Sequence, residues 1–172
     1  MKHLDGLIIE VGCWEGKSTT HLARAVFPEI LICNDTWKGN VEESKVTGVK
    51  NISETIAESR DVYSFFLGNM KQLTQGNFTV EKKDCMIFLK GLADDTKIKF
   101  CHVDASHDYE SVKETIELAN KHLVDGGILC GDDYRTANRN RRDLHGGVQR
   151  AVQEVFPVHK VIGNLWYYCK ED

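Results

Sequence analysis

Acidic side chains follow several short apolar runs of this chain, and together they could bind a cation or a hydroxylated ligand. Asp35 follows the run LICN, Asp84 follows TVEKK, Asp104 follows FCHV, and Asp132 and Asp133 follow ILCG. A carboxylate is costly to bury without a partner. If these acids converge on one crevice, they therefore need a metal ion, ligand hydroxyls or water around them.

Helix capping is the simpler role for such acids, because an aspartate often accepts hydrogen bonds from the first backbone N–H groups of a helix. Asp84 and Asp108 each precede a predicted helix, so capping and ligand binding both stay open for them. Asp104, Asp132 and Asp133 lie at strand ends, and we interpret these three as functional residues.

The stretch LIIEVGCWEGKSTTHLA predicts a strand, a glycine turn and a helix. Gly12 and Gly16 would let the backbone approach a ligand. The N–H groups at the helix start, with Ser18 and Thr19, suit a carboxylate, whereas Glu10 suits an ammonium group. An amino acid presents both groups, and an ordinary tight turn is the alternative.

Two further features narrow the class of ligand. The glycines do not form G-x-G-x-x-G, so their spacing argues against a nicotinamide dehydrogenase. Asp35 follows the second predicted strand, where an acidic residue accepts hydrogen bonds from a ribose diol in nucleotide-binding sheets. The turn and Asp35 together indicate a ligand with an amino-acid head and a ribose.

Short β-rich runs alternate with helical patterns, which predicts βαβ units around a parallel sheet. The expected strands span residues 7–11, 30–33, 78–80, 98–103, 128–130, 159–162 and 166–169, and the expected helices span 17–27, 62–73, 85–89, 112–123 and 148–156. Only three residues separate the last two strands, so these should form an antiparallel hairpin. We predict an α/β fold, a Rossmann-like three-layer sandwich with a seven-stranded, mostly parallel sheet and an antiparallel C-terminal hairpin.

The length of 172 residues suits one hydrophobic core rather than two, so we expect a single domain over residues 1–172. The polar stretch 38–60 shows no firm pattern, and it is the candidate lid or insertion. Ligands of open α/β sheets bind beyond the carboxyl ends of the strands, where the connecting segments converge.

Composition excludes several classes of protein. With 22 basic against 26 acidic side chains, the chain lacks the positive charge that binds nucleic acid by counterion release. No apolar run approaches the roughly 20 residues that cross a bilayer, and Glu10 interrupts the short apolar run near the N-terminus, unlike in a signal peptide. We therefore expect a cytoplasmic protein that binds neither nucleic acid nor membranes.

The six cysteines form no CxxC pair, which predicts reduced core residues rather than zinc ligands or disulfides.

Four segments of the chain resemble one known family. The run EVGCWEGKST, the acidic Asp35, the run VDASHDY and the run GGILCGDDY are similar to those of class I S-adenosylmethionine-dependent methyltransferases. Within that superfamily they most resemble the small, metal-dependent O-methyltransferases that act on sugars and other hydroxylated small molecules. The resemblance runs from the first strand to the closing hairpin and is weakest over residues 38–77.

The resemblance implies a cofactor site at the carboxyl ends of the first four predicted strands. It assigns the methionine end to Glu10, Gly12 and Gly16 and the methionine carboxylate to Ser18. It assigns the ribose to Asp35 with Thr36 or Trp37 beside it, and the adenine to Asp84 and Cys85. Trp14, Thr19 and Asp104 complete the predicted cofactor-binding residues.

The same resemblance implies a magnesium site. In metal-dependent members an aspartate after the fourth strand and an acidic pair after the fifth hold Mg²⁺, and Asp104, Asp132 and Asp133 match that pattern. Magnesium prefers oxygen ligands and leaves positions that substrate hydroxyls can fill, which makes those hydroxyls more acidic. His107 is the candidate general base, with Asp104 as the alternative. Catechol-type relatives carry lysine at that offset, so His107 could instead be a helix-start residue bonded to Tyr109 or to the backbone.

One basic cluster and one histidine lie near the C-terminal side of this region. The arginines are Arg135, Arg139, Arg141, Arg142 and Arg150. A solvated loop is the interpretation that we favour for them, and recognition of an acidic or phosphorylated substrate is the alternative. His145 is a weaker candidate base than His107.

These observations predict an enzyme that transfers a methyl group from S-adenosylmethionine to a hydroxyl of a small sugar- or polyol-like acceptor, assisted by Mg²⁺. A metal-independent methyltransferase and a non-catalytic S-adenosylmethionine-binding module are the alternatives. The first strand begins near Leu7, which leaves no room for the N-terminal helices that cover the acceptor in such enzymes. We therefore expect a pocket that is open, closed by residues 38–60, or completed by a second subunit in a homo-oligomer.

Overall fold

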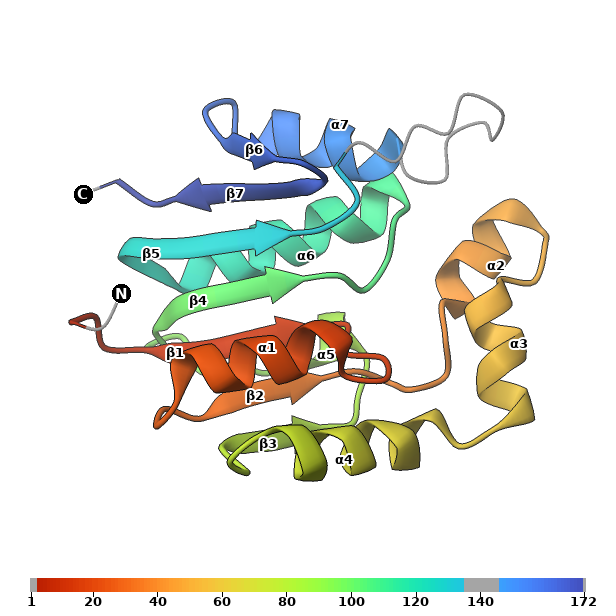
Figure 1. Ribbon diagram of the computed structural model, residues 1–172. Coiled ribbons are helices and arrows are strands. Elements are labelled where there is room, and N and C mark those ends of the chain that lie inside the picture. The colour runs from red at the N-terminus through yellow and green to blue at the C-terminus, as the bar shows by residue number, and fades with distance from the viewer. Residues whose placement is uncertain (1–2, 135–145, 172) are drawn as a thin grey trace.

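The computed structural model describes residues 3–134 and 146–171, and its centre is one seven-stranded sheet (Figure 1). The strand order is β3-β2-β1-β4-β5-β7-β6. The strands are β1 (Leu7–Val11), β2 (Leu31–Asn34), β3 (Phe78–Glu81), β4 (Ile98–Val103), β5 (Leu123–Gly131), β6 (Lys160–Ile162) and β7 (Leu165–Cys169). The first five run parallel, whereas β7 is antiparallel to both β5 and β6. The predicted fold class is therefore confirmed.

Helices cover both faces of the sheet, so the molecule has three layers (Figure 1). One face carries α1 (Lys17–Val26) and α4 (Val62–Leu73), and the other carries α5 (Cys85–Lys90), α6 (Tyr109–His122) and α7 (Gly146–Val155). Successive side chains of β1 point to opposite faces of the sheet. Ile8 therefore packs against α1 and α4, and Ile9 packs against α5, α6 and α7. Each core therefore sits between the sheet and one helical layer.

The start of β5 differs from the sequence-based expectation. The sequence predicts a helix over residues 112–123 and a short strand over 128–130, but β5 begins at Leu123, directly after α6. The reason is pairing with the chain end: Gly126 N–H donates to Lys170 O, and Lys170 N–H donates to Gly127 O. A partner strand thus extends the ladder through two glycines that, in the sequence alone, indicate a turn.

Residues 38–60, which the sequence left unassigned, contain α2 (Val41–Thr47) and α3 (Ile52–Ser59). Each helix begins with an asparagine cap: Asn40 accepts a hydrogen bond from Glu43 N–H, and Asn51 accepts one from Ser53 N–H. Gly39 has φ +77°, and a Cβ there would clash with the backbone of Glu54. The two helices form a hairpin that projects beyond the carboxyl ends of the parallel strands (Figure 1).

Two expectations from composition concern membranes and cysteines. No helix in the described part of the chain is long and apolar enough to span a bilayer. All six cysteines are free thiols, and Cys13, Cys33 and Cys101 are buried. Cys85 and Cys130 are partly buried, whereas Cys169 is exposed, so the prediction of a core residue is wrong for Cys169.

Candidate active site

A cavity of about 1180 Å³ lies at the carboxyl ends of the parallel strands, and most of the predicted site residues line it. Those that do are Gly12, Trp14, Ser18, Asp35, Thr36, Asp84, Cys85, Asp104, His107, Asp132 and Asp133. Glu10, Gly16 and Thr19 are absent from its wall. The hairpin of α2 and α3 supplies the wall opposite the strands, through residues that include Asn40, Asn51 and Ser53.

The glycine turn after β1 packs directly against the end of β4. Gly12 has φ +88°, and a Cβ at this position would clash with the backbone of Asp104. Asp104 N–H donates to Val11 O at 2.8 Å. Gly16 also has positive φ, and it begins α1 without a side-chain cap. Both turn glycines are therefore required by the backbone itself, and Gly12 brings the turn into contact with Asp104.

Asp35 holds the same turn from the end of β2. Its Oδ2 accepts hydrogen bonds from Cys13 N–H and Trp14 N–H, both at 2.8 Å, and its Oδ1 accepts one from Trp37 N–H at 2.6 Å. Burial raises the pKa of Asp35, while these backbone donors oppose the shift. Thr36 N–H is a fourth backbone donor to this carboxylate. A carboxylate has about four acceptor positions, so the turn takes up most of them, and the predicted contact with a ribose hydroxyl stays a prediction.

Glu10 is fully buried beneath the cavity rather than on its wall. Its Oε1 lies 3.1 Å from His102 Nδ1, and its Oε2 has no hydrogen-bond partner among the described residues. Burial opposes protonation of His102, but the hydrogen bond and charge of Glu10 raise the pKa of His102 above its ordinary value. Thr19 is likewise buried off the wall, whereas its neighbour Ser18 lines the cavity.

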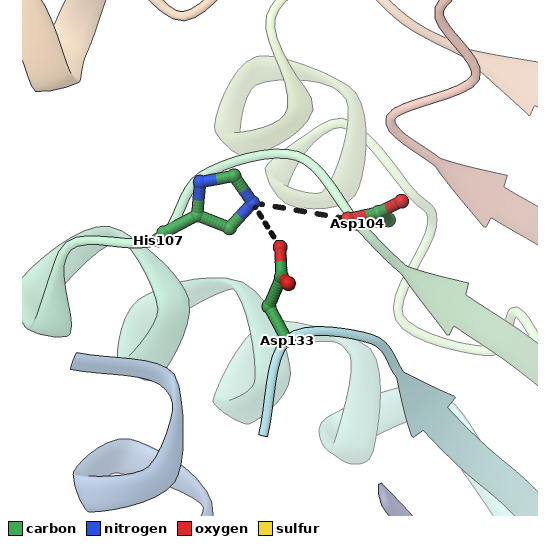
Figure 2. A group of neighbouring side chains, drawn as sticks. All are labelled: Asp104, His107 and Asp133. Carbon is green, nitrogen blue, oxygen red and sulfur yellow. Dashed lines mark ion pairs between the residues drawn. The ribbon is translucent and has the colours of Figure 1, made fainter. Parts of the chain in front are cut away.

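Asp104, His107 and Asp133, which all line the cavity, point toward one another (Figure 2). His107 Nε2 lies 2.9 Å from Asp133 Oδ2 and 3.9 Å from Asp104 Oδ1. One ligand atom from each of the three residues falls within 4.8 Å of the others. Burial lowers the pKa of His107, but hydrogen bonds to the surrounding carboxylates raise it to about 11. These carboxylates thus favour the charged form of His107, and its predicted role as the general base stays a prediction.

Asp132, the third predicted metal ligand, makes different contacts. Its Oδ1 accepts hydrogen bonds from Asp133 N–H at 2.8 Å and from Asn164 Nδ2 at 3.0 Å. Asn164 Nδ2 also donates to Asp133 Oδ1 at 3.1 Å. Sequence reasoning treated Asn164 only as part of the turn between β6 and β7. Because β7 runs antiparallel to β5, that turn returns to the end of β5, and this topology was the available signal.

A second residue that sequence reasoning missed comes from the hairpin. Glu43 of α2 is 2% exposed, and its Oε1 lies 2.5 Å from His107 Nδ1. Nothing in the polar run 38–60 distinguishes this glutamate from its neighbours, since its contact depends on a tertiary arrangement across 64 residues of sequence.

Comparison with known families decides the identity of the fold. A family model described as "Methyltransferase domain" matches residues 9–134. The chain belongs to this methyltransferase family. The resemblance to class I methyltransferases is therefore confirmed. No curated protein matches this methyltransferase significantly in sequence.

Solved O-methyltransferases share the fold of the chain. NovP is 16% identical with a TM-score of 0.64, and the match covers 99% of this chain and 74% of NovP. An O-methyltransferase from Bacillus cereus in complex with SAH is 17% identical with a TM-score of 0.60, covering 95% and 73%. CalS11, described as a TDP-rhamnose 3′-O-methyltransferase of calicheamicin biosynthesis, is 17% identical with a TM-score of 0.58, covering 98% and 73%.

The two acids with open roles both cap helices of the methyltransferase. Asp84 Oδ1 accepts hydrogen bonds from Met86 N–H at 2.9 Å and Ile87 N–H at 3.2 Å, at the start of α5. Asp108 Oδ1 accepts one from Ser111 N–H at 2.9 Å, at the start of α6. The capping interpretation is thus confirmed for both. Asp84 also lines the cavity, so its predicted place near the adenine stays a prediction.

Of the other residues considered, only some reach the site of the methyltransferase. Trp14 lines the cavity, but Trp37 is buried in the core against Tyr63 and Phe66. The Arg150 guanidinium lies 3.8 Å from the centroid of the Tyr109 ring, which joins α7 to the start of α6. Arg135, Arg139, Arg141, Arg142 and His145 lie outside the described residues.

Proposed function

We propose that this methyltransferase transfers a methyl group from S-adenosylmethionine to a hydroxyl of a small, sugar- or polyol-like acceptor, with a divalent cation, Mg²⁺, at the acceptor. The observation that carries the proposal is the group of Asp104, His107 and Asp133 on the wall of the cavity that also holds the glycine turn. One cavity thereby offers a nucleotide-type site and a carboxylate-rich site side by side.

The cavity suits S-adenosylmethionine in size and chemistry. Ligand pockets commonly occupy roughly 300–1,000 Å³, so about 1180 Å³ accommodates a cofactor and an acceptor together. Ser18 lies at the start of α1, where free N–H groups favour a carboxylate. Glu10 Oε2 has no hydrogen-bond partner among the described residues, and because Glu10 is buried off the cavity wall an ordered water would satisfy it. The relative from Bacillus cereus was solved with SAH.

The donor set fits a divalent cation. Asp104 and Asp133 supply carboxylates within reach of one point, and such hard oxygen ligands suit Mg²⁺. When bound, a divalent cation lowers the pKa of a coordinated hydroxyl and orients it. The two predicted general bases, His107 and Asp104, both lie beside this site.

The wall opposite the strands supports a hydroxylated acceptor. Asn40, Asn51 and Ser53 of the hairpin line the cavity, and amide and hydroxyl groups pair with ligand hydroxyls. CalS11, which shares the fold, is described as acting on TDP-rhamnose. The acceptor that we propose is therefore a small hydroxylated molecule rather than a nucleic acid.

A metal-independent reaction is the second candidate, because His107 Nε2 already lies against both carboxylates, 2.9 Å from Asp133 and 3.9 Å from Asp104, without a bound cation. Incubation with methyl-labelled S-adenosylmethionine and a panel of sugars, nucleotide sugars and catechols tests both. We expect transfer that stops in EDTA and returns with Mg²⁺, and that Asp133→Asn abolishes. Transfer that persists in EDTA would establish the second candidate. Cofactor binding without turnover of any acceptor would indicate a non-catalytic binding module.

A further inference from the structure

Glu43 is a buried carboxylate in a helical hairpin that otherwise consists largely of polar, partly exposed residues. It is 2% exposed, whereas no residue of the neighbouring α3 is buried. Burying a carboxylate costs free energy unless it is paired and hydrogen-bonded. Forming a wall of the cavity does not require a buried carboxylate. The role of Glu43 is therefore inferred from the groups that its carboxylate contacts.

Both oxygens of Glu43 are engaged, and one of them engages His107 twice. Oε1 accepts a hydrogen bond from His107 N–H at 3.1 Å and lies 2.5 Å from His107 Nδ1. Oε2 accepts a hydrogen bond from Asn51 Nδ2 at 2.6 Å, which ties Glu43 to the start of α3. The glutamate therefore fixes the backbone and the ring of His107 at one point.

The other ring nitrogen faces the carboxylates. With Nδ1 held by Glu43, His107 Nε2 points to Asp133 at 2.9 Å and to Asp104 at 3.9 Å (Figure 2). A histidine that binds a metal through one nitrogen commonly donates the other N–H to a carboxylate, which fixes the tautomer and the ring orientation. Glu43, His107 and the two aspartates have this arrangement.

We propose that His107, and not Asp132, is the third ligand of the divalent-cation site, and that Glu43 is the positioning residue that aims it. The proposal rests on the proposed function for its cation, and it adds the ligand set and the task of the hairpin. Among the described residues, the group whose ligand atoms lie within 4.8 Å of one another contains His107 and not Asp132. Asp132 Oδ1 instead accepts hydrogen bonds from Asp133 N–H and Asn164, which orient the end of β5. Residues 38–60 thus belong to the active site as well as covering it.

Mn²⁺ binding to the purified full chain, followed by electron paramagnetic resonance without any acceptor, tests the ligand set. We expect His107→Ala to weaken Mn²⁺ binding at least as much as Glu43→Ala, and Asp132→Asn to weaken it less than either. Loss of a carboxylate behind a metal-bound histidine commonly costs 10–100-fold in metal affinity, and we expect a loss in that range for Glu43→Ala. Strong loss in Asp132→Asn with unchanged binding in His107→Ala would overturn the proposal.

A double-mutant comparison separates positioning from general damage to the hairpin. If Glu43 acts through His107, Glu43→Ala adds no further loss of Mn²⁺ affinity in the His107→Ala background. Additive losses would overturn the positioning role. Glu58→Ala is the matched control, because Glu58 is an exposed glutamate of the same hairpin that pairs with Lys50. Glu43→Gln retains the shape and an acceptor atom, and we expect an intermediate loss, which keeps the test valid if Glu43→Ala does not fold.

Binding of S-adenosylhomocysteine, measured by calorimetry on the same variants, separates this inference from the proposed function. We expect it to stay within about twofold of the unmodified chain, since Glu43 contacts His107 and Asn51 rather than the glycine turn. An unmodified chain that binds S-adenosylhomocysteine but not Mn²⁺ overturns the ligand set and leaves metal-independent transfer. A chain that binds Mn²⁺ as described but transfers no methyl group overturns the proposed function alone.

Discussion

At the scale of single residues, the acids of the site hold backbone as well as face the cavity. Asp35 joins the turn after β1 to the end of β2, and Asp84 begins α5. Asp132 and Asp133 are held in a different way, because the side-chain amide of Asn164 donates hydrogen bonds to both carboxylates. Each of these side chains therefore affects stability and ligand binding together, and substitutions should reveal both effects.

Replacing Asp35 tests this double role. Asp35→Ala removes the acceptor of three backbone N–H groups, and each polar group left buried without a partner costs about 1–3 kcal/mol. We expect a lower free energy of unfolding in urea and a loss of S-adenosylhomocysteine affinity in calorimetry. Thr36→Ala is the control for stability, since the Thr36 hydroxyl accepts a hydrogen bond from the exposed Lys38 N–H and, like the methyl group that replaces it, leaves the backbone donors of Asp35 in place. Unchanged stability in Asp35→Ala would show that the turn does not depend on this carboxylate.

Asp108 gives a pH-dependent prediction. Burial raises the pKa of Asp108, but hydrogen bonds from Ser106 and Ser111 hold it below its ordinary value. A depressed native pKa stabilises the fold above the unfolded pKa of about 3.9, and this contribution disappears as pH falls through the native pKa. We expect Asp108→Ala to cost about 1 kcal/mol in urea unfolding at pH 7.

The same difference should shrink as the pH falls below about 4, where Asp108 becomes protonated. Asp5→Ala, at an exposed aspartate, serves as the control and should have little effect at any pH. A difference between Asp108→Ala and the unmodified chain that stays constant with pH would contradict an ionised cap.

The residue types in the sequence predicted which acidic residues lie at the site, but they did not predict the role of each one. Asp104 and Asp133 lie together because both follow strands whose carboxyl ends meet, and that follows from the alternating pattern of strands and helices. Whether Asp84 capped a helix or bound a ligand did not follow, because both tasks use the same oxygen atoms. The contacts of Glu43 and Asn164 depend on tertiary packing that no local pattern encodes.

At the scale of elements, the sheet was predictable and the hairpin of α2 and α3 was not. Strands that are buried on both faces appear in the sequence as short apolar runs, and long helices are recognised by the periodic spacing of their apolar residues. The two hairpin helices are short, and their start depends on asparagine caps and on the close contact at Gly39. Where β7 extends the pairing of β5, tertiary contacts also override the turn signal of Gly126 and Gly127.

Two glycines of the hairpin make a matched pair for testing its packing. Gly39 and Gly48 both have positive φ, at +77° and +68°, but a Cβ clashes with Glu54 only at Gly39 and meets open space at Gly48. Both alanine variants carry backbone strain, so the difference between them isolates the clash. We expect faster tryptic cleavage at Lys45 or Lys50 in Gly39→Ala than in Gly48→Ala. Equal cleavage rates would show that the contact at Gly39 does not hold the hairpin closed.

At the scale of the whole molecule, one chain supplies both walls of the cavity. The strand ends form one wall, and the hairpin of residues 41–59 forms the other, which agrees with the second of the three arrangements expected from the sequence. A second subunit that completes the pocket is therefore not required by the geometry of the described residues.

This arrangement predicts that ligand binding is independent of assembly. We expect the affinities for S-adenosylhomocysteine and Mn²⁺ to stay constant as the protein is diluted through any change of oligomeric state, because each cavity is built by one chain. Sedimentation velocity would report the assembly, and calorimetry at matched concentrations would report the affinity. Affinities that fall together with dissociation of an oligomer would show that a partner subunit contributes to the site.

The contact between Gly12 and Asp104 has a consequence for how acceptor specificity could change. Methyl transfer needs the donor carbon and the acceptor oxygen about 3 Å apart and aligned. Here the turn proposed to carry the donor touches the strand end proposed to carry the acceptor, with no side chain between their backbones. The hairpin supplies the wall of the cavity opposite the strand ends. Exchanging it for another segment, with the position of Glu43 retained, could therefore redirect the enzyme to new acceptors while the reaction distance stays set by the backbone.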